Sequence, residues 1–200
     1  MMKWIRFCVA MVFSAMVLAA CALGDNRPAA ILYDLGPFEM DMKASLPAGM
    51  PSVRTKVSTP QWMNENLMFY RLDYINNQQV RFYTESSWNA APSRLFKNRL
   101  DAFLVSSGNP VVSAKGASQS LVLRIHIEDF SQHFSSPTDS VGRIALCASL
   151  FRGGDLIAQK VFSKDVVSQT PDAQGGARAL AQGSNALVAE IMQWMLQQQL

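Results

Sequence analysis

The chain has 200 residues, of which 49% are hydrophobic and only 16% are charged. This composition excludes an intrinsically disordered chain, which would be poor in apolar residues and rich in net charge, and the length excludes a large multidomain enzyme. The formal net charge is +3, and two of the positive residues, Lys3 and Arg6, belong to a segment that we expect to be removed. The remaining chain is close to neutral, so it carries no general electrostatic footprint for nucleic acid.

The N-terminus has the pattern of a bacterial lipoprotein signal peptide. Lys3 and Arg6 precede an uncharged apolar stretch over 7–20, which is shorter than the about 20 residues of a transmembrane helix. The stretch ends in a sequence that resembles a lipobox, Leu18-Ala19-Ala20-Cys21. The small residues suit a peptidase site, and the Cys21 thiol is the nucleophile that accepts a diacylglyceryl group.

We therefore expect residues 1–20 to be cleaved and Cys21 to carry the lipid. Two or three acyl chains on one residue give stable anchoring, whereas a single chain binds only marginally. An ordinary secretory signal and an uncleaved anchor are the alternatives. By resemblance to enterobacterial sorting signals, which use Asp after the cysteine for inner-membrane retention, Ala22 favours the outer membrane of a Gram-negative bacterium, facing the periplasm. Residues 21–30 are small and polar and predict a tether.

Residues 31–200 predict one domain of the α/β class. Apolar or alternating runs over 31–35, 53–57 and 68–74 predict strands, and the turn signal Asn76-Asn77 predicts a hairpin over about 67–85. Pro92 precedes apolar residues at helical spacing, which predicts a helix over 92–107 that ends before Gly108.

The second half predicts three strands and a long helix. Alternation indicates strands over 121–128, ending near Phe130, and over 143–150, followed by a Gly153-Gly154 hairpin and a returning strand over 156–167. A C-terminal helix is expected over 171–198, with Thr170 as its capping residue. We expect both helices to cover a mixed sheet in a three-layer domain, whose core needs no metal or disulfide.

The sequence contains no motif of a familiar catalytic or metal site. A P-loop, an H-E-x-x-H motif, a zinc-type cysteine pair and a G-x-S-x-G elbow are all missing. His126 and His133 are interpreted as surface histidines, the second in a polar loop. Glu128 and Asp129 are adjacent on a strand, which predicts opposite faces. We therefore expect no enzyme, no cofactor and no metal, although a single sequence never excludes a dispersed site.

The cysteine content agrees with the lipoprotein interpretation. Cys8 leaves with the signal peptide and Cys21 carries lipid, so Cys147 is the one cysteine left. A single thiol in an oxidising compartment forms no internal disulfide. Cys147 is interpreted as a small hydrophobic residue in the core.

Motifs spread over 31–200 resemble the ABC-type transport auxiliary lipoproteins, the Pqi-type periplasmic components of MCE lipid-transport systems. The general features that match are the lipobox at Cys21, a strand ending near Phe130 and a helix bearing Trp194. The matching runs are Tyr33-x-Leu35, Val57-Ser58-Thr59-Pro60-Gln61-Trp62, Met68-x-Tyr70-Arg71-Leu72, Val80-x-Phe82-Tyr83 and Trp88-x-x-x-Pro92-x-x-Leu95. The resemblance implies the three-layer fold and a non-enzymatic role beside an ABC permease, its ATPase and an MCE-domain substrate-binding protein.

The function expected from this resemblance is docking. The lipid on Cys21 would hold the domain at the outer membrane, where it receives the MCE assembly that moves phospholipid or other hydrophobic cargo and supports envelope integrity. Two alternatives stay open: a lipid carrier with an apolar pocket, and a lipoprotein hydrolase with a dispersed site. The C-terminal helix has a Gln- and Asn-rich face, which is compatible with contact to another chain, including a homo-oligomer.

Overall fold

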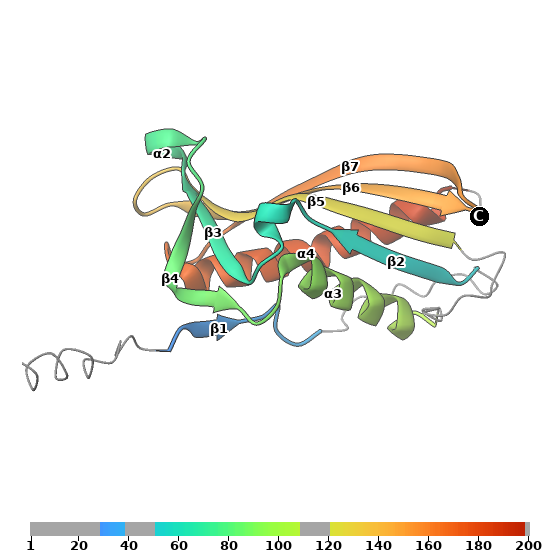
Figure 1. The fold of residues 1–200 in the computed structure, drawn as a ribbon, viewed down its shortest axis with the longest axis horizontal. Coiled ribbons are helices and arrows are strands. Elements are labelled where there is room, and N and C mark those ends of the chain that lie inside the picture. Colours follow the sequence, from blue (N-terminus) through green and yellow to red (C-terminus); the bar gives the residue numbers. More distant parts are fainter. Residues whose placement is uncertain (1–28, 39–50, 109–120, 199–200) are drawn as a thin grey trace, which may run out of the picture.

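The computed structural model describes residues 29–38, 51–108 and 121–198 of the chain. Within these ranges, a seven-stranded sheet is combined with two long helices and two short helical segments. Figure 1 shows the long helix α4 running along the sheet and α3 beside it. Cys21, the predicted signal peptide and most of the predicted tether lie outside the described residues.

The strands and helices follow each other in an order close to the predicted one. The strands are β1 (Ile31–Tyr33), β2 (Val53–Ser58), β3 (Leu67–Leu72), β4 (Arg81–Trp88), β5 (Leu121–Phe134), β6 (Ser140–Arg152) and β7 (Asp155–Val167). The helices are the 3-10 segment η1 (Gln61–Met63), α2 (Asp73–Asn76), α3 (Pro92–Ser106) and α4 (Ala173–Leu196).

The long strand β5 lies in the middle of the sheet. On one side, β6 and β7 follow in antiparallel pairing. On the other side, β2 pairs in parallel with residues 121–126 of β5, and β3 pairs in parallel with residues 131–134. β3 continues into an antiparallel pair with β4, and β1 pairs in parallel with β4. These pairings confirm the predicted α/β class and the mixed sheet.

One face of the sheet forms the hydrophobic core. The predicted alternation places every second residue of β5 and β6 on this face, where they are buried: Leu121, Leu123, Ile125, Ile127, Ile144, Leu146, Ala148 and Leu150. α4 packs on β6 and β7, α3 packs on β2, and the two helices contact each other. Thr55 of β2 is in register with Leu123 and bonds to Asp101 of α3, so both helices cover the same face.

The other face of β5, β6 and β7, which we call the open face, carries mainly polar and charged side chains with Arg124, His126 and Glu128 exposed. An antiparallel sheet can leave one face to water in this way. The predicted α/β fold with a mixed sheet covered by helices is confirmed, and both helices lie on the face opposite the open face. The internal helix and the long C-terminal helix themselves are confirmed.

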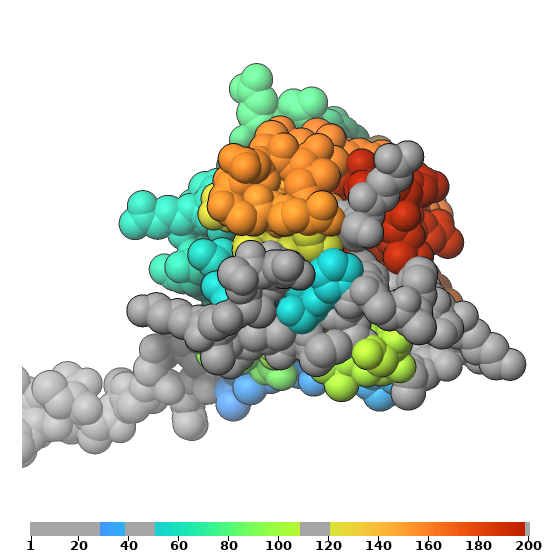
Figure 2. Space-filling model, turned by 90° about the vertical axis from the view of Figure 1, so that its right-hand side faces the viewer, coloured from blue at the N-terminus to red at the C-terminus, as the bar shows by residue number. Residues whose placement is uncertain are grey.

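The hairpin of β3, α2 and β4, residues 67–88, forms an arm whose α2 tip projects from the sheet (Figure 1). The sequence predicted this hairpin, but β3 ends at Leu72, and the two residues that were expected to extend it, Asp73 and Tyr74, begin α2 instead. In the space-filling view the tip rises behind the strands (Figure 2), and Figure 1 shows that it lies at the other end of the sheet from the β6–β7 turn.

The ends of the elements follow local chemistry. Gly153 and Gly154 adopt φ values of 61° and 106°, which confirms the predicted two-residue turn because such turns need positive φ. The predicted cap of α4 is wrong in one detail. Asp172 is the N-cap, and its carboxylate accepts a hydrogen bond from the Gly175 amide at 2.8 Å. Thr170 instead donates to that carboxylate at 2.7 Å and orients it.

Candidate functional site

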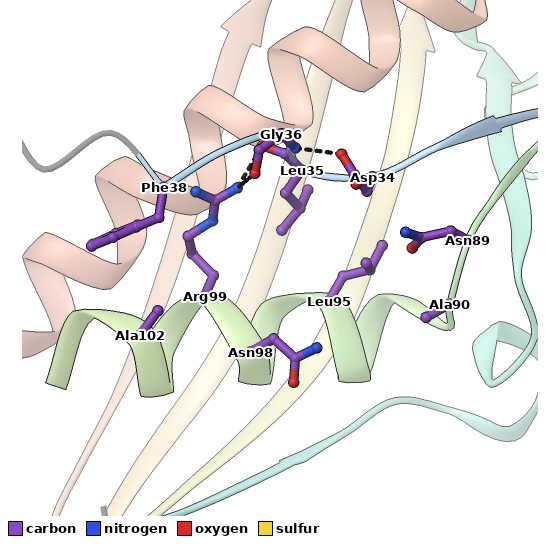
Figure 3. Close-up of a pocket in the computed structure, with 10 residues that line it drawn as sticks. All are labelled: Asp34, Leu35, Gly36, Phe38, Asn89, Ala90, Leu95, Asn98, Arg99 and Ala102. Atoms are coloured by element: carbon purple, nitrogen blue, oxygen red, sulfur yellow. Dashed lines mark hydrogen bonds between the residues drawn. The ribbon is translucent and has the colours of Figure 1, made fainter. Parts of the chain in front are cut away.

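A cavity of about 360 Å³ lies between the segment 34–38 and the helix α3. Figure 3 shows Arg99 pointing from α3 toward the backbone of this segment. The walls combine polar side chains, namely Asp34, Asn89, Asn98 and Arg99, with apolar ones, namely Leu35, Phe38, Ala90, Leu95 and Ala102. The cavity is therefore of mixed character, whereas lipid pockets are lined mainly by apolar groups with few polar ones.

Arg99 is 5% exposed, yet it faces backbone carbonyls rather than a carboxylate. Its guanidinium donates to the carbonyl oxygens of Gly36 at 2.8 Å and Pro37 at 3.0 Å, and also to that of Leu35. Burial lowers its pKa, while the charge of Asp34 acts in the opposite direction. Because Nη1 and Nη2 already donate to these three carbonyls, Arg99 holds the segment 34–38 against α3. It is therefore interpreted as a structural residue and not as a binding site for an anionic ligand.

A second group of polar residues lies on the open face, where the end of β5 meets the tip of the arm. The His133 cluster consists of Asp73, Asp129, Ser131, His133, Arg143 and Asp165. Nδ1 of His133 lies 2.9 Å from Oδ2 of Asp73, and Nε2 lies 2.9 Å from Oδ2 of Asp129. Arg143 lies beside the ring, with Nη1 3.5 Å from Nδ1, and binds Asp165 through two hydrogen bonds of 2.8 and 2.6 Å.

The charges around His133 favour its imidazolium form. Burial by itself lowers the pKa of His133, but the hydrogen bonds and the charges of Asp129 and Asp73 outweigh it and raise the pKa above its ordinary value. A hydrogen bond from Arg143 lowers the pKa of Asp165. The cluster is thus a nearly balanced set of positive and negative groups on three neighbouring strands and α2.

The sequence did not predict this cluster. His133 was placed in a polar loop, but β5 continues to Phe134, and the His133 side chain is only 8% exposed. Asp129, Ser131 and His133 alternate along the strand, so they share one face. Glu128 and Asp129 were predicted on opposite faces. A bulge between Ile127 and Asp129 changes the register, and both carboxylates lie on the open face, because an extra residue interrupts the alternation.

The geometry of the cluster resembles a Ser-His-Asp triad only superficially. Ser131 Oγ lies 3.1 Å from His133 Nε2, and Asp73 binds the other nitrogen. However, the Ser131 hydroxyl donates to Asp129, whose carboxylate also faces Nε2. Nε2 therefore carries a proton and is not free to act as a general base. Ser131 is also only 1% exposed, so a substrate carbonyl has no access to it.

Cys147 does not occupy the core position that the sequence suggested. It is half-buried on the open face, directly opposite His126 in the neighbouring strand, and accepts a hydrogen bond from Gln159. Its strand neighbours Leu146 and Ala148 point to the core, so the alternation of β6 turns Cys147 outward. It lines an open groove of about 970 Å³ together with Lys56 and Arg124. His126 is exposed, as predicted.

Several exposed apolar side chains lie on the arm and on η1 beside it. Tyr74 and Ile75 on α2, Val80 before β4, Phe82 on β4 and Trp62 on η1 are between 38% and 62% exposed. Others lie on β1 and on the edge strand β7. Trp62 packs edge-on against Phe69 with ring centroids 5.1 Å apart, and Phe69 is in register with Phe82. Phe69 itself is buried, so it links the exposed Trp62 to the core of the arm.

Within the described ranges, no three residues among His, Cys, Asp and Glu are placed to hold a metal ion. None of the helices described is long and apolar enough to cross a membrane.

Comparison with known proteins identifies the fold and goes no further. No protein-family model and no curated protein matches the sequence. The crystal structure of protein XCC0632 from Xanthomonas campestris, of the family DUF330, is 15% identical, with a TM-score of 0.68 over 86% of this chain and 93% of that chain. An uncharacterized protein of known structure is 19% identical, with a TM-score of 0.66 over 84% of this chain and 99% of that chain.

A minor lipoprotein from Acinetobacter baumannii is more distant. It is 11% identical, with a TM-score of 0.45 over 74% of this chain and 94% of that chain. This likeness carries no conclusion about function. The described domain thus has a fold that two solved proteins share along nearly their whole length, whereas its role rests on its own residues.

Proposed function

We propose that this chain is a lipid-anchored accessory subunit of an ABC transport system of the MCE type. Lipid on Cys21 holds the domain at the outer membrane, facing the periplasm. The domain docks the MCE-domain substrate-binding protein, while the permease and its ATPase supply the membrane passage and the nucleotide chemistry. Docking fixes where phospholipid or other hydrophobic cargo is delivered and so supports envelope integrity. The lipobox and the family resemblance in the sequence support this proposal.

The observation that carries the docking role is the apolar surface of the arm. The core beneath it is closed, with Met63, Met68 and Trp88 buried, so the exposed residues of the arm are not needed to complete it. Apolar patches of this kind on a folded domain mark sites of interaction. Aromatic residues such as Tyr74 and Trp62 are also enriched where one protein contacts another.

The two alternative functions receive less support from the geometry. A lipid carrier needs an apolar cavity large enough for an acyl chain, whereas the cavity at Arg99 places this charged side chain and those of Asp34, Asn89 and Asn98 among its apolar walls. A hydrolase needs an accessible nucleophile with a free base, whereas Ser131 is buried and bonded to Asp129. Docking is therefore the function that the described surface supports best.

A binding experiment with the full lipoprotein in detergent tests the proposal. The periplasmic part of an MCE-domain protein from the same organism is used as the partner, and its affinity is measured for wild type and for the variant Tyr74→Ser/Ile75→Ser. Both side chains are exposed, so their loss leaves the core intact. We expect the affinity to fall about tenfold or more, as for residues at the centre of an interface.

The matched control is Val105→Ser, because Val105 on α3 is 62% exposed, as is Ile75, but lies outside the arm. Its affinity is expected to equal that of wild type. Equal binding by the arm variant would place the docking surface elsewhere. Lipid that co-purifies in stoichiometric amount, without binding of the MCE protein, would contradict docking and favour the carrier.

A further inference from the structure

The ring of His133 is held between two carboxylates that belong to different parts of the fold. Asp129 lies on the same strand, β5, whereas Asp73 is the first residue of α2 at the tip of the arm. A neutral imidazole has one N–H and can donate to only one of these carboxylates. The imidazolium form donates to both, so the geometry itself requires the second proton.

Asp73 depends on this contact. Its Oδ2 atom binds His133, while its Oδ1 atom is buried and has no hydrogen-bond partner within the described residues. If His133 loses its proton to solvent and keeps its N–H toward Asp129, the Asp73 carboxylate faces a lone pair. The Asp73 side chain is 31% exposed, but a carboxylate with a buried oxygen and no donor is unfavourable, so α2 would move to hydrate it.

The other charged groups around the ring do not replace the lost proton. Arg143 on β6 approaches Nδ1 at 3.5 Å, but its two best hydrogen bonds are made to Asp165 on β7. Arg71 on β3 is in register with His133, and its guanidinium donates to the carbonyl of Asn77 at 3.0 Å. Both arginines are already engaged, so His133 is the group whose charge changes near neutral pH.

We propose that His133 is a proton-operated clamp that fixes the tip of the arm to the sheet. In its charged form it bridges Asp129 and Asp73 and holds α2 in the position in which Tyr74 and Ile75 present the apolar surface. In its neutral form it releases Asp73, and α2 becomes mobile. The clamp acts within this chain alone. It rests on the proposed function only in so far as the arm is the docking surface.

Hydrogen–deuterium exchange of the full lipoprotein in detergent tests the clamp without any partner. Exchange of the peptides that cover residues 73–80 is measured from about pH 5 to about pH 9, the range over which histidine titrates, and is corrected for the intrinsic effect of pH. We expect protection of this segment to fall about tenfold or more as the pH rises, the effect of losing one hydrogen bond between charged groups. Protection of β6 serves as the internal reference and is expected to stay constant.

Two variants separate the clamp from a general effect of pH. His126 is the other histidine of the chain and is exposed on the open face, so His126→Gln is expected to keep the pH response. It also leaves His133 as the single histidine, whose titration is then read directly by proton NMR and must coincide with the loss of protection. His133→Gln is expected to abolish the response and to leave residues 73–80 weakly protected at every pH.

Two results would overturn the clamp. One is protection of residues 73–80 that does not change with pH in the wild type, and the other is a pH-dependent loss of protection that persists in His133→Gln. If His133→Gln does not fold, the NMR titration of His126→Gln decides alone, because a mismatch between titration and exchange refutes the proposal. Failure of the partner-binding experiment leaves these results unaffected, so the two proposals fail independently.

Discussion

Gly176 of α4 and Gln132 of β5 meet so closely that a Cβ atom on Gly176 would lie 2.2 Å from Oε1 of Gln132. That oxygen accepts a hydrogen bond from the hydroxyl of Tyr83 at 2.9 Å, and the amide nitrogen donates to Ser140 at 2.8 Å. Burial raises the pKa of Tyr83, and the nearby Tyr70 adds to the effect. The side chain of Gln132 therefore links the arm to β6 in the space that α4 leaves empty.

The substitution Gly176→Ala is expected to destabilise the domain. The new methyl group would displace Gln132 and break its bonds to Tyr83 and Ser140, which are part-buried or buried. Leaving such groups unsatisfied costs about 1–3 kcal/mol each. The free energy of unfolding, measured by chemical denaturation, is expected to fall by about 2 kcal/mol or more.

Gly183→Ala is the matched control on the same helix. There the added Cβ would meet the flexible side-chain end of Ile144 at 3.3 Å, with no polar network nearby. Alanine also favours a helix by about 1 kcal/mol over glycine, so the expected loss is small or absent. Equal destabilisation by both substitutions would show that crowding, rather than the Gln132 network, controls stability.

Asp172 is expected to stabilise α4 in a manner that depends on pH. The backbone hydrogen bond from Gly175 and the hydrogen bond from the Thr170 hydroxyl lower the pKa of the Asp172 carboxyl. A lowered pKa means that the stabilisation is present above the unfolded value of about 3.9 and is lost as the pH falls through the native value. Asp172→Ala should cost about 1 kcal/mol at neutral pH, and the difference from wild type should shrink in acid.

The comparison variant is Asp172→Asn, because an asparagine at this position still accepts the hydrogen bond of the helix terminus. Its cost at neutral pH is expected to be small. Because the asparagine cap does not titrate, the variant should gain stability relative to wild type as the pH falls toward about 3. Thermal unfolding across this range measures both variants. A loss in Asp172→Ala that persists unchanged at low pH would contradict a charged cap.

Arg99→Ala is expected to release the segment 34–38 from α3. Three backbone carbonyls lose their donor together, and the unfolding free energy should fall by about 2–4 kcal/mol, as expected for several hydrogen bonds to a buried charge. Arg94 lies on the same helix but is exposed, so Arg94→Ala should change stability by less than about 0.5 kcal/mol. Limited proteolysis within 34–38 that stays unchanged in Arg99→Ala would argue against this role.

The anchor itself is tested at Cys21, which lies outside the described residues. We expect Cys21→Ala to abolish incorporation of labelled palmitate and to block maturation of the precursor, because no other residue can replace the thiol in lipidation. The control Cys147→Ala should keep normal labelling. Palmitate labelling that persists in Cys21→Ala would refute the lipoprotein assignment.

The fold could be predicted from the sequence wherever the side-chain pattern reports the local structure. The alternation in β5 and β6, the Gly153-Gly154 turn and the helical spacing after Pro92 all correspond to elements of the structure. The helix ends were correct within a few residues, because proline and glycine act locally. The face of the sheet that each helix covers could not be predicted, because the periodicity of a strand does not indicate which helix packs on which face.

The candidate sites were less predictable, because they depend on register and on distant parts of the chain. The bulge after Ile127 shifts Asp129 by one position, and no sequence signal marks it. Asp73 reaches His133 only because β3 runs parallel to the end of β5. The spacing of Asp129, Ser131 and His133 is the one signal that could have revealed the cluster, provided that the strand had been extended through it.

The attachment of β1 to β4 has a mechanical consequence. If Cys21 is fixed in a membrane, any pull on the domain enters the folded part at Ile31 and is carried by the parallel pairing of β1 with residues 86–88 of β4. Arg99 shares this load through its bonds to the following carbonyls. The strand that receives the force is also one side of the arm, so tension on the tether and contact at the arm act on the same hairpin.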